Sequence, residues 1–444
     1  MRSKKVTYTG RIVYRLRKNN AKANDFPLKN HVIEVNGTKT KTDSNGNFRV
    51  NTDEFKSKKI CVKIPAENDY VKVRPKGRAS SYAKEHRYPP NEVVNYKIPQ
   101  IYLLERDDES IAVMISQRLI YAYELLKKIG WNDKDKVSVV YPLKNLTYDC
   151  HDILYIQGGL YDDATLFHEF AHSVAFEYKF MAFSYHQHNA LSNRMVDVPK
   201  GCLPISKKSC TKLTFNEGFA EFFSRMVIKT FQKELDIADA NYYDGYYYPL
   251  AKGQHKYFGE VMEECVGSVL YEMIDSNFES YYPSELKDHP SGIDLKKLMN
   301  WIREYGKKNY KNEHFSGFIG YIRDKYKLDY ARMFNVFEKY GFAIRNISFT
   351  SKTRTFKFEN GGDSRPNARA ASMLNSLLCN IYNPSEKKWY QIKEFNLNNC
   401  TCQIPLDTYK KLGKKFGCYF SCSQIDSSGF KTGPYFTGDR WFDK

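Results

Sequence analysis

Residues 168–172 of this 444-residue chain read HEFAH and place two histidines four positions apart. Such positions lie on one face of an α-helix, so His168 and His172 would present both imidazoles to the same point. The other face would pack in a core, because it is apolar and carries Leu166, Phe167, Phe170, Ala171 and Val174. The pattern therefore predicts a half-buried helix with two ring nitrogens directed at one place.

Two imidazoles at this spacing suit a zinc ion, which binds histidine nitrogen at about 2 Å. Glu169 lies a step around the helix and can reach a metal-bound water without coordinating the ion. The alternative is an ordinary helix whose histidines are only hydrogen-bonded. The chain has 10 histidines in 444 residues, which makes a chance HExxH less frequent. A third ligand would decide between the two interpretations.

The third ligand can come from two places. In the layout H-E-x-x-H-x-x-G-x-x-H it follows on the same segment. Ala175 and Tyr178 stand at the glycine and histidine positions of that layout, so it fails here. The other source is a second predicted helix, TFNEGFAEFF, which carries Glu217 and, one turn later, Glu221.

Glu217 itself has two interpretations. With Thr214 it matches a capping box, in which its carboxylate only satisfies a backbone amide at the start of a helix. As a ligand it would complete the metal site, and the small residues Gly218 and Ala220 would let two helices approach closely. We favour the ligand, with Glu221 as the alternative ligand or as a supporting residue.

The two motifs together resemble a known class of enzymes. HEFAH followed by NEGFAEFF is similar to the gluzincin zinc metallopeptidases, which include the aminopeptidase N-like and thermolysin-like enzymes. The run GEVMEECVGSVLYEMID (259–275) resembles a helix that follows the glutamate ligand in bacterial secreted members. The resemblance covers residues 110–340, roughly, and implies that His168, His172 and Glu217 are the zinc ligands and Glu169 the general base.

Two departures from the aminopeptidase N-like pattern favour an endopeptidase: the spacing to the third ligand is longer, and no GAMEN-type segment is present. In the expected mechanism Glu169 takes a proton from a zinc-activated water and passes it to the leaving amine. A tyrosine or histidine would support the oxyanion, and the sequence leaves the choice open among Tyr242, Tyr243, Tyr246, Tyr247, Tyr248 and His255. Asp162 and Asp163 are predicted caps of the motif helix, or residues that orient a ligand histidine.

Residues 1–106 read as short strands and turns, with VTYTGRIVYRL, HVIEVNG, NFRVN and KKICVKIP as the predicted strands. Asp43, Asn45 and Gly46 predict a tight turn in TDSNG. This arrangement resembles the carboxypeptidase regulatory-like (transthyretin-like) β-sandwich over about 65 residues. The polar stretch RPKGRASSYAKEHRYPPNE (74–92) predicts a long loop or a crossing to the next domain.

Residues 107–345 are predicted to be mainly helical with a small sheet. A helix runs from a cap at Asp107 or Asp108 to Gly130, the strands VSVVYP and DILYIQGG follow, and LDYARMFNVFEKYG (328–341) is a later helix. From residue 346 to 444 the pattern is strand-like and predicts a second β-sandwich. The expected fold is therefore multidomain α+β: a mainly helical gluzincin-like metallopeptidase domain between N- and C-terminal β-sandwich domains.

The chain carries 69 Lys and Arg against 51 Asp and Glu, a net charge of +18. We expect a solvated basic surface, with contact to an acidic cell surface or glycan as the alternative. The basic residues are spread and no nucleic-acid motif accompanies them, so no nucleic-acid partner is expected. No apolar run approaches the roughly 20 residues that span a bilayer. The sequence does not predict an oligomeric state.

The N-terminus MRSKKVTYTG has no apolar signal core, which fits a mature exported chain with an added start Met, or a cytoplasmic protein. Five of the ten cysteines follow residue 378, and Cys202 and Cys210 flank a polar loop. This clustering favours disulfides and a secreted or cell-surface location. A zinc knuckle is the alternative for the series Cys400, Cys402, Cys418 and Cys422, although its spacings miss the usual C-x2-C pairs.

The sequence thus predicts a zinc-dependent metallopeptidase that acts on a peptide or protein substrate, most simply as a secreted or surface endopeptidase. One alternative is a binding or adhesion protein that has kept the fold without turnover, although such a site would be expected to lose Glu169 early. The other is a zinc hydrolase of a non-peptide or cell-wall amide bond, since the same metal and base serve either substrate.

Overall fold

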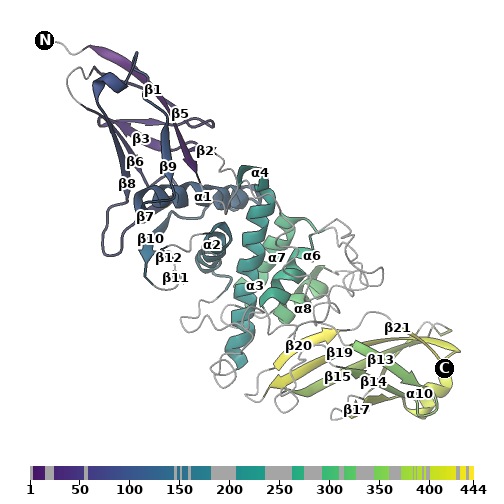
Figure 1. The fold of residues 1–444 in the computed structure, drawn as a ribbon. Coiled ribbons are helices and arrows are strands. Elements are labelled where there is room, and N and C mark those ends of the chain that lie inside the picture. The colour runs from purple at the N-terminus through teal and green to yellow at the C-terminus, as the bar shows by residue number, and fades with distance from the viewer. Residues whose placement is uncertain are drawn as a thin grey trace. The chain divides into compact units, whose positions relative to one another are not determined.

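The computed structural model (Figure 1) shows an α+β protein with several separate sheets. It describes residues 4–15, 25–54, 59–144, 148–150, 153–158, 162–181, 207–235, 263–274, 293–309, 315–326, 345–359, 372–383, 385–386, 388–392, 395–396, 401–426, 431–436 and 440–444. The chain divides into two compact units, one of Met1–Glu177 with Phe223–Ala240 and one of Tyr178–Phe222 with Asn241–Lys444. Helix α3 (Lys207–Thr230) contributes residues to both units. The three-part division at residues 106 and 345 stays a prediction.

The N-terminal strands form two four-stranded sheets (purple to blue in Figure 1). In the first, β1 (Lys5–Arg15) pairs with β2 (Asp25–Pro27), β5 (Asn47–Asp53) and β9 (Ile101–Leu104). The second has the order β4 (Thr38–Lys41), β3 (Val32–Val35), β6 (Ile60–Pro65) and β8 (Ala83–Tyr88). The four strands predicted from the sequence are therefore confirmed as β1, β3, β5 and β6.

Strand β8 corrects the predicted loop at 74–92. It pairs antiparallel with β6 from Ile60↔Tyr88 to Pro65↔Ala83. Because β8 lies at the edge of its sheet, its side chains are half-buried or exposed. An edge strand of this kind tolerates the polar composition that suggested a loop.

The predicted turn in TDSNG is confirmed. The Asp43 carboxylate accepts hydrogen bonds from the backbone amides of Asn45 and Asn47, both at 2.8 Å. Gly46 has a φ of +76°, and a Cβ there would overlap the carbonyl oxygen of Ile12. Glycine is therefore required at this position for both its conformation and its size.

His31 is fully buried in this segment, with Nε2 at 2.6 Å from the Pro65 carbonyl oxygen. Burial lowers the pKa of His31 from its ordinary 6.5 to about 4, because the charged imidazolium is poorly solvated there. The unfolded chain then binds the proton more readily than the folded one between these two values. Stability should be complete above pH 6.5 and fall as pH drops toward 4, by up to about 3 kcal/mol.

A comparison with His31→Gln tests this pH dependence. The free energy of unfolding, measured by denaturant titration from about pH 7 down to about pH 4, should fall less steeply in the variant. The same slope in both proteins would contradict the assignment.

Helix α1 (Asp108–Lys128) packs on β7 (Val71–Arg74). Its N-cap is Asp107, whose carboxylate accepts from the Ser110 amide, and Gly130 follows its end with a φ of +84°. Strand β7 is the edge of the sheet β11 (Tyr148–Cys150), β12 (Ile153–Gln157), β10 (Val137–Leu143) and β7, in which β10 is parallel to both β7 and β12. The predicted helix is confirmed as α1 and the predicted strands as β10 and β12. Strand β7, from the strand-rich first hundred residues, pairs with β10 in the same sheet.

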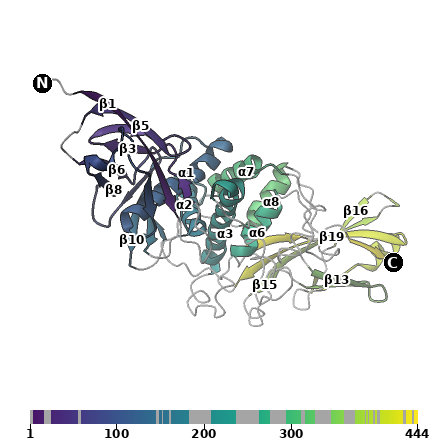
Figure 2. The same ribbon diagram turned by 45° about the horizontal axis from the view of Figure 1, so that its top comes forward.

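The second unit contains helices α6 (Glu263–Glu272), α7 (Leu295–Lys308) and α8 (Phe315–Tyr326). Figure 2 shows α7 and α8 side by side. Their core is aromatic: Phe215 of α3 lies 5.6 Å from Phe315 and 5.8 Å from Phe318, measured between ring centroids. The predicted helix at 328–341 lies outside the described residues.

The C-terminal strands form two sheets within the second unit. One has the order β13 (Arg345–Thr350), β14 (Thr355–Glu359), β18 (Thr401–Gln403) and β17 (Phe395–Asn396). The other has the order β16 (Lys388–Ile392), β15 (Ser372–Asn383), β19 (Lys415–Asp426) and β20 (Lys431–Phe436), with β21 (Arg440–Asp443) also on β19. Both sheets contribute to one buried cluster, which includes Phe356, Ile381 and Phe416. A short helix, α10 (Leu406–Lys411), follows β18.

Three cysteines belong to this C-terminal cluster. Cys379, Cys402 and Cys418 are buried thiols, and burial raises the pKa of Cys379 well above its ordinary value. Cys400 lies outside the described residues, so the disulfide and zinc-knuckle interpretations both stay predictions. Among the described helices, none has the length and apolar character needed to cross a bilayer.

Candidate metal centre

The HEFAH segment lies on helix α2 (Asp163–Glu177), as predicted. Asp162 caps this helix: its carboxylate accepts from the Thr165 amide at 2.8 Å and from the Thr165 hydroxyl at 2.6 Å. Asp163, the other predicted cap, is the first helical residue and pairs with Arg118 instead, at 3.5 Å between Nε and Oδ1. The start of α2 is therefore held by a cap and by an ion pair.

Arg118 comes from α1, and its side chain is 0% exposed. Its guanidinium lies over the rings of Tyr14 and Phe26, at 5.4 and 5.0 Å from their centroids, and Nη2 is 3.4 Å from the Leu235 carbonyl oxygen. A buried guanidinium needs a nearby anion to offset its lost hydration, and Asp163 provides one. This role of Arg118 could not be predicted from the sequence, because the apolar spacing of 111–129 indicates only a packed helix and not which polar side chain is buried.

The apolar face of α2 is buried as predicted. Phe167, Phe170 and Val174 are all 0% exposed. Phe170 lies 6.0 Å from Phe223 of α3 between ring centroids, and the Ser224 hydroxyl donates to the Ala164 carbonyl at 2.8 Å. The later half of α3 therefore packs directly along α2.

The two histidines lie on the face of α2 that the spacing predicted. Their Nε2 atoms are 3.1 Å apart, and the two rings are nearly perpendicular. Two nitrogen ligands of one tetrahedral zinc ion, each at 2.0–2.1 Å, lie about 3.3 Å apart. The separation of the ring nitrogens thus already matches that of two ligands on one ion.

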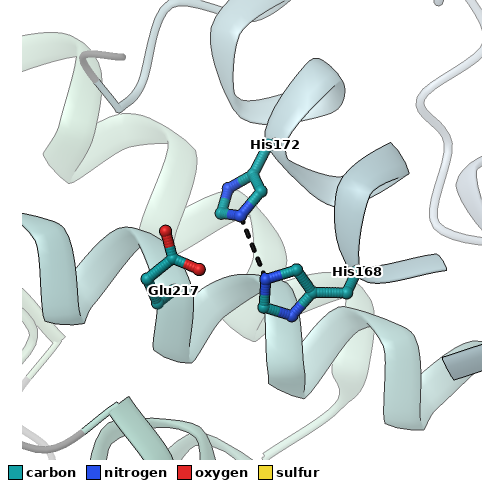
Figure 3. Close-up of side chains that lie close together, drawn as sticks. All are labelled: His168, His172 and Glu217. Atoms are coloured by element: carbon teal, nitrogen blue, oxygen red, sulfur yellow. Dashed lines mark hydrogen bonds between the residues drawn. The ribbon is translucent and has the colours of Figure 1, made fainter. Parts of the chain in front are cut away.

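Glu217 of α3 completes the cluster (Figure 3), in which its carboxylate points toward the two imidazoles. One ligand atom from each of His168, His172 and Glu217 lies within 4.8 Å of the others, so the three side chains could hold one metal ion. His172 and Glu217 are buried, at 3% and 5% exposure, while His168 is half-buried. The donor set of two imidazoles and one carboxylate is one that zinc accepts.

The structure contradicts one of the two interpretations of Glu217. Helix α3 begins at Lys207, so Thr214 and Glu217 lie in its interior and the capping box is wrong. The carbonyl oxygen of Gly218 would lie 3.0 Å from a Cβ at Gly267 of α6. Helices α3 and α6 therefore approach closely beside Glu217, and the small residue that this contact requires is Gly267, which the sequence did not identify.

Glu221 does not join the cluster. Its Cβ would lie 3.3 Å from a Cβ at Gly267, which places Glu221 against α6. Of the two glutamates on α3, the structure brings Glu217 to the histidines.

Glu169, the predicted base, is buried at 4% exposure between the two histidines in the chain. Its Oε2 atom has no hydrogen-bond partner among the described residues. A buried carboxylate oxygen normally has a partner, because burial without one costs about 1–3 kcal/mol or more. Glu169 Oε2 is thus an exception among buried carboxylate oxygens in the part of the chain that the structure describes.

The oxyanion candidates lie outside the described residues: Tyr242, Tyr243, Tyr246, Tyr247, Tyr248 and His255.

The chain has no significant match among protein-family models, curated proteins or solved structures.

Proposed function

We propose that the protein is a zinc-dependent metallopeptidase of the gluzincin type, with His168, His172 and Glu217 as the metal ligands. The observation that carries the proposal is the convergence of these three side chains, from two helices far apart in the sequence, within 4.8 Å. Three protein ligands with an open fourth position are typical of catalytic zinc sites, whereas structural sites use four.

Zinc held by these residues would supply a Lewis acid that polarises the scissile carbonyl and acidifies a bound water. Glu169 would act as the general base: it accepts the proton of the attacking water and delivers it to the leaving amine. Its unpartnered Oε2 and its place between the two ligands on one helical turn support this role. The ion pair of Asp163 with Arg118 would hold helix α2, which carries the two histidine ligands and Glu169.

A peptide or protein substrate, rather than another amide, is the part of the proposal that rests on the resemblance of HEFAH and NEGFAEFF to gluzincins. We further propose that the strand-rich segments before and after the helices are β-sandwich domains, the first of them of the carboxypeptidase regulatory-like kind. Modules of this kind fit a secreted or surface endopeptidase. The protein would then bring a zinc site to substrates outside the cell.

Mass-spectrometric mapping of a diverse peptide library tests this function. Zinc-loaded wild type should make internal cuts, and Glu169→Gln should lower their rate by about 10²–10⁴-fold while the zinc content stays the same, because only the base is lost. Glu234→Gln, an exposed position on α4 (Gln232–Leu235), is the matched control and should cut like wild type.

Three results would change the proposal. Equal cutting by wild type and Glu169→Gln would remove Glu169 from the mechanism. Loss of single N-terminal residues would indicate an aminopeptidase. No cutting by the zinc-loaded wild type would favour a binding protein or a hydrolase of another amide bond.

A further inference from the structure

A polar pocket lies in the N-terminal strand segment, apart from the residues of the metal centre. It has a volume of about 880 Å³ and is lined by β1, β5, the end of β4 and residues 97–100. Four cationic side chains contribute to it: Arg11, Lys41, Arg49 and Lys97. All four residues are exposed.

The pairing of β1 with β5 explains why positive charge gathers at one end of this sheet. Lys5 opposite Asp53 forms an ion pair at 2.9 Å, and Thr7 opposite Asn51 forms a hydrogen bond at 3.0 Å. The next outward-facing rungs are Thr9 opposite Arg49 and Arg11 opposite Asn47. Each of these two cross-strand pairs contains one cation and no acid, so this face of the sheet changes from neutral to basic along its length.

Among the residues that the structure describes, the charges of the pocket are only partly paired. Lys41 pairs with Asp69 at 3.3 Å on the surface, and Arg11 donates from Nε to the Asn45 carbonyl at 3.1 Å. Among the described residues, no acidic side chain pairs with Arg49 or Lys97. The acid that lines the pocket, Asp43, already accepts from two backbone amides and the Asn47 side chain.

The lining indicates which kind of anion fits. Its apolar members, Phe48 and Ile98, are 4% and 1% exposed, so the pocket offers no apolar anchor of the kind that dominates protein interfaces. It offers no exposed aromatic ring on which a nucleic-acid base could stack. Its accessible groups are the four cations, the Asp43 carboxylate and the neutral polar side chains of Thr9, Asn47 and the half-buried Gln100, so cations outnumber the acid four to one.

We propose that this pocket binds a polyanionic polysaccharide, whose sulfate or carboxylate groups meet Arg49, Lys97 and Arg11 and whose hydroxyls meet the neutral polar side chains. Charged hydrogen bonds from arginine to such anions are strong and directional. The site would hold the protein on an acidic glycan independently of the metal centre.

Binding of a heparin oligosaccharide and of an oligogalacturonate to the full chain tests the proposal and distinguishes sulfated from carboxylated chains. Wild type should bind at least one of them, with an affinity that falls as salt is raised. Arg49→Glu combined with Lys97→Glu should weaken binding roughly tenfold or more, because both unpaired cations are reversed. The control, Lys352→Glu with Lys410→Glu, changes the net charge equally at exposed C-terminal positions and should bind like wild type.

Circular dichroism and the unfolding midpoint would establish that both double variants fold. Failure of wild type to bind either oligosaccharide would overturn the proposal, as would equal weakening in the two double variants. Tighter binding of polyglutamate or of oligo-dT would instead assign the pocket to an acidic peptide or a single-stranded nucleic acid. Peptide cleavage should be the same in wild type and in the pocket variant, so this test is independent of the proposed function.

Discussion

Glu217→Ala should bind zinc at least about a hundredfold more weakly than wild type, whereas Glu221→Ala should stay within about tenfold of it. The reason is the different placement of two glutamates one turn apart on α3. Glu217 lies with His168 and His172, and Glu221 lies against Gly267 of α6. Loss of a residue that only supports a ligand typically weakens metal binding by about 10–100-fold. Loss of a ligand itself should weaken zinc binding more.

Competition with a chromophoric chelator measures both zinc affinities under the same conditions. Both substitutions remove one buried or half-buried glutamate from the same helix, so Glu221→Ala controls for damage to α3. If Glu221→Ala loses the metal and Glu217→Ala keeps it, the third ligand lies one turn further along the helix.

Asp163→Ala should lower the free energy of unfolding by about 3–5 kcal/mol, which is a large fraction of the stability of an ordinary domain. The substitution leaves the Arg118 guanidinium, 0% exposed, without the carboxylate at 3.5 Å. Leaving a charge buried without its partner costs more than removing the pair. The double variant Arg118→Met with Asp163→Ala should therefore recover part of the loss.

The neighbouring Asp162→Ala is the matched control. It removes the cap of α2, which accepts from Thr165, and should cost about 0.5–2 kcal/mol. Denaturant unfolding of the four proteins measures these differences. An Asp163→Ala loss no larger than that of Asp162→Ala would show that the ion pair does not hold the helix.

Local patterns in the sequence predicted much of the fold. The apolar spacing of 111–129, with a start at Asp107 and an end at Gly130, predicted a helix that is confirmed as α1. Alternation of apolar and polar residues predicted strands β1, β3, β5 and β6. Strand β8 was not predicted, because an edge strand needs no apolar face and its pairing with β6 is a non-local contact. A polar stretch carries no signal that distinguishes such a strand from a loop.

The candidate site, too, was predictable from the sequence only where the signal is local. The spacing of His168 and His172 is local, so their common face could be predicted, and the structure places their Nε2 atoms 3.1 Å apart. The role of Glu217 depended on where α3 begins, and Ser206, Ser209, Thr211 and Thr214 are all residue types that cap helices, so the sequence does not single out Lys207 as the first helical residue. Arg118 and Gly267 have partners that are distant in the sequence, such as Asp163 and Gly218, and a single sequence does not reveal such pairs.

The central claim is that His168, His172 and Glu217 hold zinc, and anomalous X-ray scattering from zinc-loaded crystals tests it most directly. Data collected on the two sides of the zinc absorption edge should give one strong peak, at about 2.0–2.2 Å from both Nε2 atoms and from a Glu217 carboxylate oxygen. A peak elsewhere in the protein, or none at these three side chains, would contradict the account.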